Sequence, residues 1–330
     1  MTNVTGAGVP APVCPICDGA TAAFRQGLYD DRYGHPGLYD ARRCRVCGHV
    51  FLDTAFTDEA LGRLYSDWYP RATRHYAELP PLARTSGFAA WLNGERHAAH
   101  SWVPRNVSVL DIGCGFGQTL ALHESRGCRA VGVEADENAV SEAQAQGLTV
   151  LHGLFDPSRH DPASFDYVTM DQVLEHARLP IDFMRGVASV LKDGGVAVIS
   201  TPNAGGYGMR VFGERWINWH VPYHLNLFTR ASLRRLARET GFEVRSIRTT
   251  TASAWLRYQW LANASRPAPG ASSSFWDPKR ASDAGRPLKR ARRWAKRLDR
   301  VHAFQLVTRA VDSLGIGDNM VAVLVKPAPA

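Results

Sequence analysis

The chain has little that would place it in or across a membrane. None of its apolar runs reaches the roughly 18 residues that a membrane-spanning helix needs. The first fourteen residues, MTNVTGAGVPAPVC, lack a basic region followed by an apolar core, so they predict no signal peptide. Six cysteines, four of them in two C-x-x-C pairs, fit a metal site in a reducing compartment better than a disulfide framework. We therefore expect a cytoplasmic protein.

Most of the chain has little net charge, and the excess of positive charge is concentrated in one segment. The formal net charge is +8, yet residues 253–315 alone carry thirteen Lys or Arg against four Asp or Glu. The remainder is nearly neutral. Because no recognised nucleic-acid module accompanies the charge, we rank nucleic acid last among the partners of this segment.

Two cysteine pairs predict a metal site near the N-terminus. Cys14-Pro-Ile-Cys17 and Cys44-Arg-Val-Cys47 supply four thiolates, the ligand set of a tetrahedral structural zinc site. A redox-active C-x-x-C pair is the competing interpretation, although such a pair usually occurs singly. The loop between the pairs is rich in Tyr, Asp and His, and it either forms a wall of a substrate pocket or packs this lobe onto the rest of the protein. Its members are Tyr29, Asp30, Asp31, Tyr33, His35 and Tyr39.

Beyond residue 100, strand and helix patterns alternate, as in a parallel sheet covered on both faces. We expect strands near 107–111, 130–134, 148–152, 165–170, 196–201, 242–251 and 319–327. Helices are expected near 118–126, 136–146, 180–191 and 231–240, the third ending at Gly194-Gly195, where glycine suits a left-handed cap. A helical lead-in is expected within 76–104.

A glycine loop follows the first of these strands. In the run VLDIGCGFG, Asp111 precedes glycines at alternate positions, Gly113, Gly115 and Gly117. Such glycines let the backbone turn sharply and approach a ligand closely, and the following helix presents free N–H groups. The next strand ends in Glu134, an acid that is placed to accept both hydroxyls of a ribose.

The spacing D-x-G-x-G-x-G together with Glu134 resembles the S-adenosylmethionine (SAM) loop of class I methyltransferases. The fourth-strand segment, the L-K-x-G-G turn and the sequence STPN recur in that family, so the resemblance covers about residues 100–250 and the last strand. It implies a doubly wound, Rossmann-like α/β fold with a seven-stranded sheet and a final antiparallel strand. The implied cofactor residues are Asp111, Gly113, Gly115, Gly117, Glu134, Ala135, Leu154, Phe155, Asp171 and Gln172.

The cysteine lobe makes the chain similar to bacterial methyltransferases of sugar, polysaccharide and secondary-metabolite pathways. That resemblance implies methyl transfer to a hydroxyl of a saccharide or secondary metabolite. C- or N-methylation of a sugar intermediate, RNA or protein methylation through a basic docking helix, and a SAM-binding scaffold without turnover remain alternatives. The oligomeric state is not visible in the sequence.

Three histidines are candidate bases, His176, His220 and His224, because the ordinary pKa of histidine suits proton transfer near neutrality. Ubiquinone-pathway and small-RNA O-methyltransferases, which the chain also resembles here, hold a divalent metal through E-x-x-E-H and a later histidine. In this sequence Gln172 stands at the first position, whereas Glu175 and His176 match and His224 is available as the last ligand. Such a metal site, a metal-free histidine base, and histidines that only anchor their loop by hydrogen bonds all remain open.

Aromatic residues surround two of these histidines. We expect Trp216 and Trp219 to contact the acceptor, since indole faces suit sugar rings or planar acceptors, and we expect Phe228 to belong to the core.

We divide the chain into a zinc-binding lobe (1–75), a methyltransferase core (76–252), a basic insertion (253–315) and the last strand with a tail (316–330). The Pro-, Gly- and Ser-rich first half of the insertion is expected to be mobile. The second half predicts an amphipathic helix with Leu288, Ala291, Ala295, Leu298 and His302 on one face. That helix either packs on the domain with a solvated basic face, or lies on an anionic membrane through residues 288–311, or holds nucleic acid or an acidic substrate.

Overall fold

A computed structural model describes residues 12–69, 82 and 87–328. The boundary expected between residues 75 and 76 and the start of the helical lead-in lie outside these residues. The lead-in that is described consists of short helices, α2 (Phe88–Asn93), η3 (Glu95–His97) and η4 (Ala99–Trp102). Among the described helices, none combines the length and apolar character that crossing a membrane requires.

The larger of the two sheets has seven strands, as expected. In spatial order they are β10 (Glu243–Thr249), β11 (Asn319–Val325), β8 (Leu191–Pro202), β7 (Phe165–Asp171), β4 (Ser108–Ile112), β5 (Arg129–Glu134) and β6 (Val150–His152). β11 runs antiparallel to both of its neighbours, and the other pairs are parallel. Residues of β4 are buried throughout, because helices or other segments cover both faces of the sheet. The expected doubly wound fold with a final antiparallel strand is confirmed.

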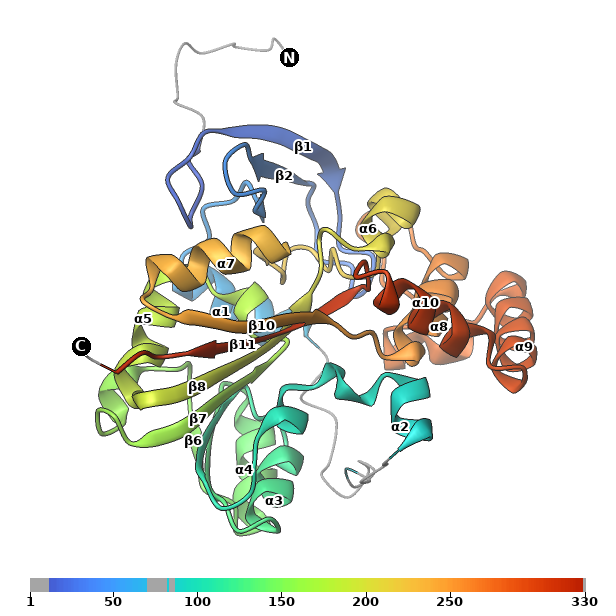
Figure 1. The fold of residues 1–330 in the computed structure, drawn as a ribbon. Helices are drawn as coiled ribbons and strands as arrows, with labels where there is room; N and C mark the ends of the chain where they lie inside the picture. Colours follow the sequence, from blue (N-terminus) through green and yellow to red (C-terminus); the bar gives the residue numbers. More distant parts are fainter. Residues whose placement is uncertain (1–11, 70–81, 83–86, 329–330) are drawn as a thin grey trace.

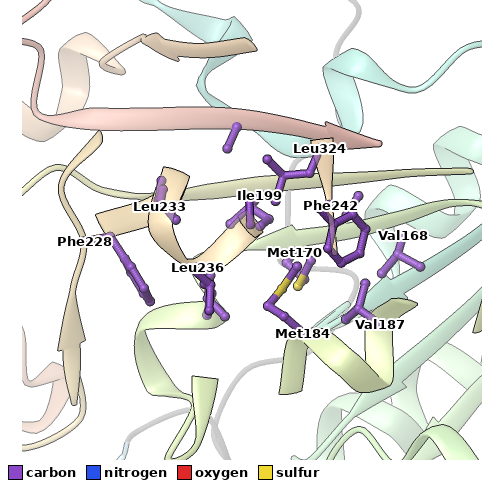
Figure 2. Close-up of a cluster of buried hydrophobic side chains, with 14 of the residues drawn as sticks. Val168, Met170, Met184, Val187, Ile199, Phe228, Leu233, Leu236, Phe242 and Leu324 are labelled. Carbon is purple, nitrogen blue, oxygen red and sulfur yellow. The ribbon is translucent and has the colours of Figure 1, made fainter. Parts of the chain in front are cut away.

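Helices cover the sheet on both sides (Figure 1). α3 (Gln118–Glu124) and α4 (Glu137–Ala145) pack on β5 and β6, while α5 (Pro180–Val190) packs on β8 and α7 (Arg230–Glu239) on β10. In the largest hydrophobic cluster, Met170 and Ile199 of the strands face Met184 of α5 and Leu236 of α7 (Figure 2). One detail differs from expectation: α5 ends at Val190 with an extended cap at Leu191, and Gly194 takes its positive φ of 75° within β8.

A second, four-stranded sheet belongs to the N-terminal lobe, but its last strand comes from the core. β1 (Thr21–Leu28), β2 (Tyr39–Cys44) and β3 (Val50–Leu52) are followed in space by β9 (Asn226–Leu227). Val50 of β3 pairs with Leu227 of β9, more than 170 residues along the chain. The segment between β8 and α7, which includes α6 (Tyr207–Phe212) and η7 (Gly213–Arg215), therefore joins lobe and core.

The expectation that Trp216 and Trp219 contact the acceptor is wrong. Their side chains are 1% and 3% exposed and pack with apolar residues of the lobe sheet. Trp216 Nε1 donates to Asp318 Oδ1 at 2.8 Å, and Trp219 Nε1 donates to the Gly213 carbonyl at 2.9 Å. Both indoles are therefore core groups of the lobe–core junction. Phe228 is fully buried, as expected.

The insertion forms a helical layer of its own, made of α8 (Ser253–Ala264), η8 (Pro278–Asp283), α9 (Arg286–Arg300) and α10 (Ala303–Ser313). Leu288, Ala291 and Ala295 are buried in α9, as expected. His302 is not on that face: it is exposed, with φ 55°, in the turn between α9 and α10. The predicted single helix is thus two.

The first half of the insertion, expected to be mobile, packs against the loop between the cysteine pairs. Tyr29 Oη donates to the Pro267 carbonyl at 2.8 Å, and the Ser273 N–H donates to the Arg32 carbonyl at 2.9 Å. The Arg32 guanidinium lies 4.4 Å from the centre of the Trp276 ring. These contacts hold the segment in place despite its composition.

Candidate active site

The glycine loop lies at the carboxyl end of β4 and approaches the segment after β7. Gly113, Gly115 and Gly117 all have positive φ, between 55° and 79°. A Cβ on Gly113 would lie 2.5 Å from Val173 Cγ2, so this position tolerates no side chain without movement of its neighbour. α3 begins directly after the loop, at Gln118. The loop therefore presents backbone rather than side chains to the end of the sheet.

Asp111 stabilises the start of this loop from inside. Its carboxylate is buried and accepts hydrogen bonds from Thr169 Oγ1 at 2.7 Å and from Thr119 Oγ1. Burial raises its pKa to about 6. These bonds tie β4 to β7 and to α3, which makes Asp111 a support of the loop.

Glu134 ends β5 and touches the same loop. Its Oε2 accepts the Gly115 N–H at 2.8 Å, and its Oε1 accepts the N–H groups of Ala135 and Asp136 at 2.8 and 3.0 Å. Ala135 itself is exposed, and its carbonyl oxygen lies 3.2 Å from His152 Nε2. Glu134 and the glycine loop thus meet at the carboxyl ends of the strands, where open α/β sheets bind their ligands.

The two residues expected around an adenine have different environments. Leu154 is 73% exposed after β6. Phe155 is partly buried, and its ring centre lies 5.4 Å from that of Phe183 in α5 and 6.0 Å from that of His160. The structure thus places only Phe155 in a packed apolar setting.

The polar side chains at the end of β7, Asp171 and Gln172, form hydrogen bonds within the protein. Asp171 Oδ2 accepts the Ala99 N–H at 2.9 Å and lies 3.8 Å from His100 Nδ1. Gln172, with φ 55°, donates from Nε2 to Ser200 Oγ at 3.1 Å and to Asn319 Oδ1 at 3.0 Å. Gln172 is therefore directed toward β8 and β11, and it is not part of the acid–histidine group that follows.

Glu175, His176 and His224 form that group, with one ligand atom of each lying within 4.8 Å of the others. Glu175 is fully buried, and burial raises the pKa of its carboxyl group to about 8. Its Oε2 accepts a hydrogen bond from Thr201 Oγ1 at 3.0 Å. Its Oε1 is buried with no hydrogen-bond partner among the described residues. A buried carboxylate oxygen in this state is costly unless a ligand, ion or proton meets it.

Hydrogen bonds to backbone carbonyls define the histidine tautomers. His224 Nδ1 donates to the Asn218 carbonyl at 2.9 Å, and its Nε2 lies 3.4 Å from His220 Nδ1. Burial lowers the pKa of His224 well below its ordinary value, and the nearby His176 lowers it further. His176 Nδ1 lies 2.8 Å from both the Tyr223 carbonyl and Tyr65 Oη, and the carbonyl can only accept. In both rings the hydrogen bond to a carbonyl oxygen therefore places a proton on Nδ1.

Four tyrosines contact one another beside these histidines. Tyr33 from the loop between the cysteine pairs meets Tyr69 and Tyr223 edge to face, with ring centres 5.4 and 5.8 Å apart. Tyr65 of α1 (Asp58–Trp68) meets Tyr223 at 5.5 Å. Tyr33 stands out in the sequence as part of a loop rich in Tyr, Asp and His, but no sequence signal connects Tyr65 and Tyr69 with the site, because only the tertiary fold brings α1 to His176.

The four cysteines expected to bind metal lie together. The Sγ atoms of Cys14 and Cys47 are 3.6 Å apart, as are those of Cys17 and Cys44, and all four lie within 4.8 Å of one another. These distances exclude disulfides. They approach the separation of about 3.8 Å that four sulfurs have around a tetrahedral zinc ion with Zn–S bonds of about 2.3 Å. The hydrogen bond from the Cys47 thiol lowers the pKa of Cys14 to about 5.

Comparison with known proteins gives a consistent result. The sequence model of the methyltransferase domain family matches residues 70–247, just over half of the chain. A ubiquinone biosynthesis O-methyltransferase of Azoarcus sp. is 30% identical over 204 residues, which are 58% of this chain and 85% of that protein. The enzyme of the same name from Aeromonas salmonicida is 28% identical, and the alignment covers 42% of this chain but only 64% of the relative.

Among solved structures, the [4+2]-cyclase SpnF is similar with a TM-score of 0.50 and 21% identity, covering 83% of this chain and 98% of that one. At this identity the likeness concerns the fold alone. The family match, the strand order and the glycine loop that meets an acid agree with one another. The chain belongs to the class I, SAM-dependent methyltransferase family.

Proposed function

We propose that the protein transfers a methyl group from SAM to a hydroxyl of a small-molecule acceptor, a saccharide or secondary metabolite, with His176 as the base. The observation that carries the proposal is the position of His176, which is partly buried beside Glu175 and His224 and lies three residues after Val173, the neighbour of Gly113 in the glycine loop. The two relatives named above, both called O-methyltransferases, support transfer to oxygen.

Different residues have different roles in the proposed reaction. SAM supplies a methyl group that its sulfonium charge has already activated. The glycine loop, supported by Asp111, would leave room for the amino-acid end of SAM. Glu134 and Ala135 would meet its ribose, and Phe155 would pack near its adenine. As the acceptor oxygen forms its bond to the methyl carbon and the sulfur–carbon bond breaks, the hydroxyl proton passes to His176 Nε2.

His176 is better suited to this step than the other two histidines. His224 is fully buried and its pKa is strongly lowered, so it accepts a proton poorly. His220 contacts His224 and Tyr223, with ring centres 4.8 Å apart in each case, and it positions them. Tyr223 in turn orients His176 through its carbonyl oxygen.

Substitution of the base tests the proposal. His176→Asn should lower kcat for methylation by about 10²- to 10⁴-fold, the usual contribution of a general base, and leave the affinity for S-adenosylhomocysteine nearly unchanged. His302→Asn, at the exposed turn after α9, is the matched control. The assay uses labelled SAM and a panel of hydroxylated sugars, sugar nucleotides and phenols. A product methylated on carbon or nitrogen, or on RNA or protein, would overturn the hydroxyl assignment.

A divalent cation at Glu175, His176 and His224 is a second candidate feature of this site. The buried, unpartnered Oε1 of Glu175 fits such an ion, although Gln172 replaces one carboxylate and points elsewhere. These three residues would hold the ion, which would lower the pKa of a bound hydroxyl. Dialysis against a chelator followed by titration with Mg²⁺ tests this idea, since metal-dependent turnover that Glu175→Gln abolishes would support it. Full activity without added metal would contradict it.

We also propose that the four-cysteine cluster binds a zinc ion. The four thiols offer the charge, number and spacing of a closed structural site, which leaves no position for a reacting ligand. Its role is therefore to hold the lobe, and with it Tyr33, against the core.

A further inference from the structure

The outer face of α9 carries an unusual density of positive charge. Eight of its fifteen residues are Arg or Lys, and all eight are exposed: Arg286, Lys289, Arg290, Arg292, Arg293, Lys296, Arg297 and Arg300. None of them forms an ion pair with another described residue. The one acid of the helix, Asp299, pairs with Arg257 of α8 at 3.3 Å. We call these eight residues the basic face of α9.

Two tryptophans lie at the edge of this face. Trp294 of α9 and Trp260 of α8 are 45% and 46% exposed. Together with Arg290 they line one shallow groove of about 660 Å³. The Arg297 guanidinium lies 5.1 Å from the centre of the Trp294 ring. Large exposed indoles beside unpaired cations have no evident purpose within the fold itself.

The position of α9 on the outside of the molecule leaves its basic face accessible to a large binding partner. α9 is the outermost element on its side of the molecule, separated from the seven-stranded sheet by α8 and α10 (Figure 1). Its apolar residues are buried against the rest of the insertion, in a cluster with Leu261 and Phe304. The apolar face is thus unavailable, and only the cations and the two indoles face outward.

We propose that the basic face of α9, with Trp294 and Trp260, docks the protein on an anionic lipid bilayer. Tryptophan settles at the level of the lipid headgroups, and Lys and Arg are attracted to an anionic leaflet within about a Debye length. Because the apolar face stays inside the protein, the contact is a surface contact that is reversible and weakened by salt. A nucleic acid would also attract the cations, and binding of an oligonucleotide is therefore one outcome of the test below.

Vesicle binding by the full chain tests the proposal. The protein should sediment with phosphatidylcholine vesicles that contain an anionic phospholipid at about 30%, and should not sediment with phosphatidylcholine alone. The triple variant Arg290→Gln, Arg293→Gln and Arg297→Gln should bind about 100-fold more weakly, since each cation near an anionic surface contributes about fivefold. A control that removes three exposed arginines elsewhere, Arg105→Gln, Arg234→Gln and Arg245→Gln, should lose at most about threefold, through the net charge alone.

The tryptophans give a second readout. Lipids brominated in the upper acyl chain should quench the fluorescence of the bound protein, and Trp294→Phe should reduce this quenching. The proposal is overturned if anionic vesicles do not retain the protein, or if the control variant loses as much binding as the α9 variant. It is also overturned if an oligonucleotide binds through these arginines while vesicles do not.

Discussion

The proposed cofactor end and the proposed acceptor side of this site are built in different ways. At the cofactor end, Asp111, the three glycines and Glu134 lie within 24 residues of sequence, and the Gly115 N–H donates to the Glu134 carboxylate. On the acceptor side, Tyr33, Tyr65, His176 and Tyr223 come from four segments spread over about 190 residues. A cofactor site whose residues are close in sequence can be shared across a family. An acceptor site whose residues are distant in sequence can change with the lobes that supply them.

The two regions also differ in how their charges are satisfied. Backbone N–H groups surround Glu134 and donate hydrogen bonds to its carboxylate oxygens. Around Glu175, burial dominates: it raises the pKa of the Glu175 carboxyl group to about 8 and lowers the pKa of the neighbouring His224. The acceptor side is therefore a low-dielectric region in which a proton can be exchanged near neutral pH. Three experiments test whether the two regions differ in this way.

The largest effect should come from the cysteine cluster. Cys44→Ser removes one of four ligands, and we expect loss of one zinc ion per chain, a fall of about 5 kcal/mol or more in the free energy of unfolding of the lobe, and loss of methylation. Affinity for S-adenosylhomocysteine should stay within about fivefold, because the cofactor end belongs to the other sheet. Metal analysis, thermal melts and calorimetry measure these quantities. Cys128→Ser, a buried thiol outside the cluster, is the control. Equal loss of cofactor affinity would show that the two regions are not separable.

An alanine in the glycine loop should produce the opposite pattern. Gly113→Ala places a Cβ 2.5 Å from Val173 Cγ2 at a φ of 73°, so S-adenosylhomocysteine should bind at least about tenfold more weakly, while zinc content is unchanged. The added substitution Val173→Ala should restore part of the affinity by removing the clash. Gly62→Ala in α1, where an added Cβ meets nothing, is the control. Unaltered affinity in Gly113→Ala would contradict the role given to the loop.

The smallest expected effect is a change in the pH dependence of stability, and it comes from Asp318 at the junction between the lobe and the core. Asp318 accepts hydrogen bonds from Trp216 Nε1 and Asn218 Nδ2, and burial raises its pKa to about 7, above its value in the unfolded chain. The folded state therefore holds this proton more tightly, and the stability it contributes is lost as pH rises from about 4 to about 7.

Urea unfolding at pH 5 and at pH 8 measures this loss. Asp318→Asn should reduce the fall in the free energy of unfolding between the two pH values by roughly 1–3 kcal/mol. The exposed Asp182→Asn should leave the fall unchanged. An identical pH dependence in Asp318→Asn and the wild type would show that Asp318 is ionised throughout.

The same contrast explains what sequence could and could not predict. The seven strands follow from apolar runs and glycine turns, which are local signals, and so does the meeting of the glycine loop with Glu134. The pairing of β9 with β3 has no local signal, because two residues after a long loop carry no strand pattern. For that reason the sequence predicts Trp216 and Trp219 near the acceptor, whereas both belong to the core of that junction. His302 fitted the helical spacing of α9, but spacing does not reveal that the backbone turns there.

Calorimetric titration of the zinc-loaded protein with S-adenosylhomocysteine tests the central claim most directly. We predict a dissociation constant on the order of micromolar for the wild type, binding weakened at least about tenfold in Glu134→Ala, and unchanged binding in Glu137→Ala, which removes an exposed acid three residues further on. Absence of binding to the folded wild type, or full affinity in Glu134→Ala, would contradict the cofactor site described above.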